Sequence, residues 1–121
     1  MTRPQTIPPG SPEPAAAKAI DRDHLARYTL GDAALEHEIL DLFATQVVKL
    51  LSAVVDAESQ SEWRFATHSI KGSARAVGAW DLAATAERLE AMQPGDAATA
   101  DEIAQLIAAV KDAVAAASAP L

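Results

Sequence analysis

The stretch SQSEWRFATHSIKGSARAVG, residues 59–78, decides the fold of this chain because it has the pattern of one complete amphipathic helix. Ser59 and Glu62 form an S-x-x-E capping box, which is a common start of an α-helix. Gly78 offers a left-handed end to the same helix. Between these signals the inward-facing residues follow at helical spacing: Trp63, Ala66, Ile70, Ala74 and Val77. The stretch therefore predicts a helix that packs one side against a core.

The segments around this helix predict three more long helices and a short one. The long helices are expected over residues 32–57, over 79–92, and from Asp96 to the frayed end of the chain. The short helix is capped by Asp21 or Asp23 and stops at Gly31. Because short turns join the long helices, we predict an all-α fold: an antiparallel up-down four-helix bundle with one or two short N-terminal helices.

The first residues differ in composition from the rest of the chain. Five of the seven prolines fall in residues 1–14. Such a stretch cannot be an α-helix, so we predict a flexible, Pro-rich tail. The remaining residues, 15–121, are predicted to form a single helical domain.

The charge and composition of the chain exclude several functions. A net charge of −7 leaves no basic patch for nucleic acid or for an anionic membrane surface. The absence of cysteine excludes thiolate metal sites and cysteine nucleophiles, and we expect no cofactor. No apolar run is long enough to span a membrane, and the first residues lack the apolar core of a secretory signal. We therefore expect a cytoplasmic protein, with a monomer as the simplest oligomeric state.

The outward face of the helix over 59–78 carries the candidate chemistry. His68, Lys71, Gly72 and Arg75 stand at i, i+3, i+4 and i+7, which places them on one side of a helix. An exposed imidazole is mostly neutral at cytoplasmic pH, and its unprotonated nitrogen can attack phosphorus. Lys71 could form a charge-assisted contact with the phosphoryl group, and Arg75 could add longer-range attraction.

Gly72 is unusual inside a helix, because glycine there costs about 1 kcal/mol relative to alanine. One explanation is room, since a missing side chain one turn after His68 lets another protein approach the imidazole. The other is a tight contact between helices of this chain, for which Gly78 is also suited. Spacing alone leaves both open.

The run HSIKGSARAVGA, residues 68–79, resembles the signature of histidine-containing phosphotransfer (HPt) domains. It has the histidine, the lysine at +3, the glycine at +4 followed by two small residues, and the glycine at +10. The resemblance extends over about residues 21–117 and implies a four-helix-bundle carrier of multistep two-component phosphorelays, rather than an enzyme with turnover of its own.

The resemblance also implies roles for the residues of this run. His68 would accept phosphoryl from the aspartate of one response-regulator receiver domain and pass it to another. Lys71 would steady the phosphoryl group, and Gly72 would leave the docking path open. The implied partners are receiver domains and a hybrid sensor kinase.

Two further residues have roles that the sequence leaves open. Relatives often carry a polar residue, in several of them glutamine, on the next helix to orient the active histidine. Here that position is Glu90. Its carboxylate could accept the N–H of His68 and fix the tautomer, or it could be an exposed surface charge. Phe65 could belong to an apolar docking patch beside His68, while Trp80 is expected to pack against the turn between helices.

Other functional classes fit the sequence less well. It has no glycine-rich phosphate-binding motif, so the chain is not a kinase by itself. His24 and His37 are expected at the surface, because no Glu-x-x-His motif or other ligand spacing supports a metal site. The alternative to a phosphotransfer protein is a non-catalytic helical adaptor that binds a protein partner without phosphotransfer.

Overall fold

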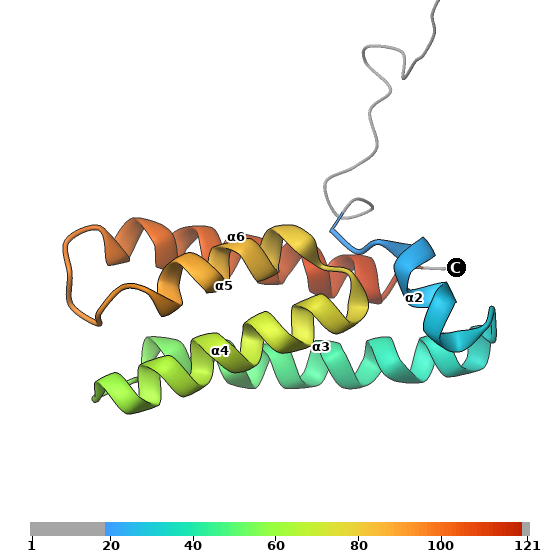
Figure 1. The fold of residues 1–121 in the computed structure, drawn as a ribbon, viewed down its shortest axis with the longest axis horizontal. Helices are drawn as coiled ribbons and strands as arrows, with labels where there is room; N and C mark the ends of the chain where they lie inside the picture. The colour runs from blue at the N-terminus through green and yellow to red at the C-terminus, as the bar shows by residue number, and fades with distance from the viewer. Residues whose placement is uncertain (1–18, 120–121) are drawn as a thin grey trace, which may run out of the picture.

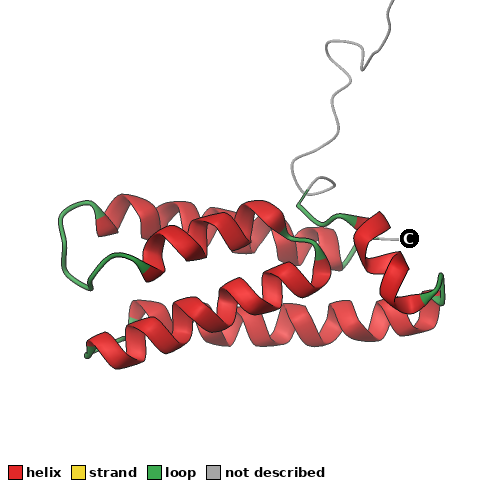
Figure 2. Cartoon of the chain, viewed as in Figure 1, coloured by secondary structure: helices red, strands yellow, loops and turns green. Residues whose placement is uncertain are grey.

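The computed structural model describes residues 19–119, and throughout that range its regular structure is helical (Figures 1 and 2). Its helices are α2 (Arg22–Thr29), α3 (Ala33–Val55), α4 (Gln60–Val77), α5 (Trp80–Glu90) and α6 (Thr99–Ala117). The predicted all-α four-helix bundle is confirmed. Helices α3 to α6 run alternately in opposite directions and each packs against two of the others, while α2 lies across one end (Figure 1). The predicted tail over residues 1–14 lies outside the described residues.

Three helices begin with a side-chain cap at a predicted position. Asp21 accepts a hydrogen bond from the backbone N–H of His24, at 3.1 Å, at the start of α2. Asp32 does the same at the start of α3, and Ser59 at the start of α4. The second half of the capping box differs from the expected form, because the Glu62 carboxylate accepts from the N–H of Glu58 instead of that of Ser59.

The start of α6 differs from the prediction. Asp96 does not cap this helix, which begins three residues later and has Ala98 at its N-cap without a side-chain hydrogen bond. The Asp96 carboxylate instead accepts a long hydrogen bond, at 3.4 Å, from the N–H of Gln93. The hydroxyl of Thr99 donates to the Gln93 carbonyl at 3.0 Å. These contacts close the loop on itself, so its residues are not available to extend α6.

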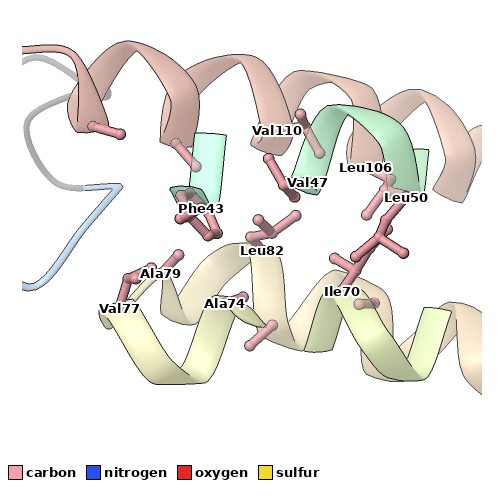
Figure 3. Packing of buried hydrophobic residues seen from close by; sticks show 14 of the residues in the cluster. Phe43, Val47, Leu50, Ile70, Ala74, Val77, Ala79, Leu82, Leu106 and Val110 are labelled. Atoms are coloured by element: carbon pink, nitrogen blue, oxygen red, sulfur yellow. The ribbon is translucent and has the colours of Figure 1, made fainter. Parts of the chain in front are cut away.

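The core lies between the four long helices, and Figure 3 shows side chains from all of them meeting there. The predicted inner face of α4 is confirmed, since its five residues expose no more than 2% of their surface: Trp63, Ala66, Ile70, Ala74 and Val77. The apolar residues of α3 recur at helical spacing from Leu35 to Val54 and so predict an apolar stripe, which is wider than the buried face of that helix. Leu35 and Leu42 belong to the stripe but are exposed, because only part of the circumference of α3 meets α4 and α6.

The turn between α4 and α5 also holds α2 in place. Gly78 has φ of 79°, and its carbonyl accepts a hydrogen bond of 2.9 Å from the N–H of Asp21. The indole N–H of Trp80 donates to the Asp21 carboxylate at 3.1 Å, and the His24 ring meets the Trp80 ring edge to face. Trp80 therefore lies at the turn as predicted, although it remains partly exposed.

Candidate functional site

His68 lies near the middle of α4, on the side turned away from the core. Its side chain is 67% exposed, whereas Ala66 and Thr67 before it and Ile70 after it are buried. The burial of these neighbours fixes the rotation of the helix about its axis. The imidazole is therefore presented to the solvent by a rigid support.

Glu90, the last residue of α5, contacts both His68 and Lys71. Its Oε2 lies 2.9 Å from Nδ1 of His68, and its Oε1 lies 2.6 Å from Nζ of Lys71. The hydrogen bond from Lys71 is the main cause that lowers the pKa of Glu90 below its ordinary value, with a smaller contribution from His68 against the opposing effect of burial. The carboxylate is therefore ionised at neutral pH.

This contact determines which imidazole nitrogen is available. An ionised carboxylate can only accept hydrogen bonds, so Nδ1 of His68 must be the donor. In a neutral ring the lone pair is then on Nε2. Because Nδ1 donates to Glu90, the nitrogen that carries the lone pair is Nε2, and it makes no contact with Glu90.

Lys71 does not lie on the fully exposed face where the helical spacing places it. Its side chain is only 15% exposed and lies at the boundary between α4 and α5. The ion pair with Glu90 draws the long side chain over this boundary. The ammonium is thus held close to His68 by the carboxylate that both residues share.

The two glycines of the motif have different surroundings. A Cβ added to Gly72 would meet nothing within 4 Å among the described residues, so no close helix contact in residues 19–119 explains this glycine. A Cβ added to Gly78 would lie 2.8 Å from the Cβ of Asp21. Gly78 is therefore the glycine that permits a close contact within the chain, whereas Gly72 leaves open space beside His68.

A hollow in the surface opens on the N-terminal side of His68. It is lined by residues from the first half of α4 together with Glu90: Gln60, Ser61, Arg64, Phe65 and His68. Phe65 is 71% exposed and supplies an apolar wall. Sequence reasoning did not single out Arg64 or Ser61, although their spacing of four and seven residues from His68 places them on its face.

Arg75 and the remaining histidines lie apart from this hollow. Arg75 pairs with Glu87 of α5 at 3.6 Å, and both side chains are about half exposed or more. His24 packs against aromatic rings at the far end of α4, and His37 is exposed on α3. Within residues 19–119 no three potential ligands come together to hold a metal ion.

The fold is a helical bundle whose packed scaffold holds the imidazole of His68 at the surface. The family model of the Hpt domain matches residues 34–119, which contain α4 to α6 and all of α3 except its first residue. The chain belongs to this family, as the run from His68 indicates. Comparison with curated proteins and with solved structures gave no match.

Membership of the Hpt family gives the chain a general role in histidine phosphotransfer within a phosphorelay. Domains of this family are phosphotransfer carriers that interact with receiver domains and kinases. No helix in the described part of the chain is both long enough and apolar enough to cross a bilayer.

Proposed function

We propose that His68 is the phosphoryl acceptor and that Nε2 is the atom that carries the group. The observation that supports this most directly is the 2.9 Å contact between Nδ1 and Glu90, because it leaves Nε2 as the unprotonated nitrogen of an exposed ring. The donor is the phosphorylated aspartate of one receiver domain, and the acceptor is the aspartate of another. A hybrid sensor kinase supplies the first receiver, and the protein acts as a cytoplasmic monomer.

In the proposed transfer, the lone pair of Nε2 forms a bond to phosphorus. The bond between phosphorus and the aspartyl oxygen breaks, and its electron pair returns to the receiver carboxylate. The imidazole, which keeps its proton on Nδ1, becomes positively charged. Glu90 stabilises this charge through the hydrogen bond already in place, so its carboxylate orients the ring before transfer and supports the product after it.

Three neighbours of His68 have supporting roles in this proposal. Lys71 stabilises the phosphoryl oxygens, for which its ammonium must share its contact with Glu90. Gly72 leaves space for the receiver, and Phe65 provides an exposed apolar contact for docking. Arg75 adds longer-range electrostatic attraction from its position on the same side of α4.

Transfer from a phosphorylated receiver tests the assignment of His68. The protein is incubated with receivers from the same genome that carry labelled phosphoryl, and the product is expected to be acid-labile and base-stable. His68→Gln should abolish the label, whereas His37→Gln, which changes an exposed histidine of α3, should retain it. A label that persists in His68→Gln would contradict the assignment. Absence of label from every receiver would favour the adaptor function instead.

Substitutions at Gly72 and Lys71 test the supporting roles. Gly72→Gln should leave the fold intact, because glutamine is a better helix former and the space is open, yet it should slow transfer by blocking the receiver. Lys71→Ala should shorten the lifetime of phosphohistidine or slow transfer. Unchanged rates in either variant would remove that residue from the proposal.

A further inference from the structure

The outward side of α4 carries a row of cationic residues in a chain with a net charge of −7. The cations are Arg64, Lys71 and Arg75, and they flank His68 at four residues before it and at three and seven residues after it, so all four lie along a single side of the helix. Such a row in an acidic chain concentrates positive charge around the histidine.

The cations of this row differ in whether a carboxylate already balances them. Lys71 is paired with Glu90, and Arg75 is paired with Glu87. Arg64 is exposed, and its guanidinium makes no hydrogen bond or ion pair with the other residues in 19–119. It lines the same hollow as His68. Arg64 is therefore the cation beside the histidine whose charge is not already balanced within the described chain.

A phosphoryl group on His68 needs such a charge. Phosphorylation adds nearly two negative charges at neutral pH. Lys71 and Glu90 largely offset one another, and Glu90 lies on the Nδ1 side of the ring. Side chains of a helix lean toward its N-terminus, which directs His68 over the turn that contains Arg64. A guanidinium can also donate two parallel hydrogen bonds to phosphoryl oxygens.

We propose that Arg64 binds the phosphoryl group carried by His68 and is the main cation on the side of the ring opposite Glu90. This inference rests on the proposed role of His68 as the phosphoryl acceptor. In this arrangement Lys71 divides its charge between Glu90 and the phosphoryl oxygens, and Arg64 supplies the cation that no carboxylate of the described residues balances.

The test separates binding of the phosphoryl group from binding of a partner by using no protein partner. Phosphoramidate is the donor: its P–N bond breaks as the bond from Nε2 to phosphorus forms, and ammonia leaves. The phosphorylated wild type, Arg64→Gln and Arg75→Gln are compared by ³¹P NMR during a pH titration and during spontaneous hydrolysis. Arg75→Gln is the matched control, because it removes an equal charge from the same side of α4.

Arg64→Gln should raise the pKa of the phosphoryl group by about half a pH unit, the size expected for one exposed charge pair. It should also shorten the phosphohistidine lifetime by about threefold. The phosphoryl oxygens lose negative charge as the P–N bond loosens, so the cation stabilises the intact phosphohistidine more than the transition state of its hydrolysis. Arg75→Gln should change both quantities much less, because Arg75 lies two turns from His68, is paired with Glu87 and is assigned only longer-range attraction.

Three outcomes would overturn the inference. An unchanged titration and lifetime in Arg64→Gln would do so, even if transfer from a receiver became slower, because Arg64 would then serve the partner. Equal effects of the two substitutions would show a general charge effect. If phosphoramidate labels the wild type but also labels His68→Gln, the acceptor assignment itself fails and the role of Arg64 fails with it.

Discussion

Alanine substitution at the two glycines of the motif should change the stability of the fold in opposite directions. Gly72→Ala should raise the free energy of unfolding by about 0.5–1 kcal/mol, because alanine is the better helix former and its Cβ meets nothing within 4 Å. Gly78→Ala forces a side chain into a backbone with φ of 79°, which costs about 1–2 kcal/mol.

A second cost adds to the strain at position 78. The new Cβ would lie 2.8 Å from the Cβ and 2.9 Å from the carbonyl oxygen of Asp21, so α2 must move away. This movement threatens the backbone hydrogen bond between Asp21 and Gly78 and the contact from Trp80, each worth about 1 kcal/mol. The expected loss for Gly78→Ala is therefore about 2–4 kcal/mol.

Urea unfolding followed by far-UV circular dichroism measures both changes, with thermal unfolding as a second readout. A change of 1 kcal/mol corresponds to about 4 °C in a domain of this size. Gly78→Asn separates the two costs, because asparagine tolerates the left-handed conformation but still carries a Cβ. If Gly78→Ala is as stable as the wild type, or if Gly72→Ala is clearly less stable, the division of roles between these glycines is wrong.

Three further substitutions test the site and its support. The pKa of Glu90 is lowered below its ordinary 4.5, so its ionised form stabilises the fold above that pH, and this contribution is lost as the pH falls through the lowered pKa. The difference in unfolding free energy between wild type and Glu90→Gln should therefore shrink from about pH 6 to about pH 3. A difference that stays constant over this range would contradict the role of Glu90. Trp63→Phe should cost about 0.5–1.5 kcal/mol in urea unfolding, because it removes the buried indole hydrogen bond of 2.8 Å while the Leu89 carbonyl keeps the N–H of Met92; a smaller loss would show that this bond contributes little. Phe65→Ala should leave stability within about 0.5 kcal/mol, since the ring is exposed, yet weaken receiver binding in a titration; unchanged affinity would remove Phe65 from the docking surface.

The sequence predicts the helices well where their signals are local. The caps at Asp32 and Ser59 and the inner face of α4 follow from short-range pattern, and the structure has them in place. Asp96 fails as a cap because its side chain and its loop have another set of hydrogen bonds available. Leu42 is apolar and lies at helical spacing, yet it is exposed. The sequence pattern shows that a residue is apolar, but its burial depends on which neighbouring helices contact it.

The sequence predicts the members of the candidate site more readily than their geometry. The spacing of His68 and Gly72 identifies an outward face, and counting along the family pattern leads to Glu90. A helical wheel, however, contains no information on how near the next helix lies. Lys71 is partly buried only because α5 brings a carboxylate to it. Arg64 stood on the same wheel, but its significance depends on which of the other cations are already paired.

The position of α5 along α4 connects the core to the chemistry of the site. The indole N–H of Trp63 donates to the carbonyl of Leu89, which directly precedes Glu90 in the last turn of α5. This buried bond ties the end of α5 to a fixed level of α4, five residues before His68. A shift of α5 by one residue would turn Glu90 by about 100° around its helix and remove its carboxylate from both partners. The register that Trp63 helps to fix thus sets which nitrogen of His68 contacts Glu90.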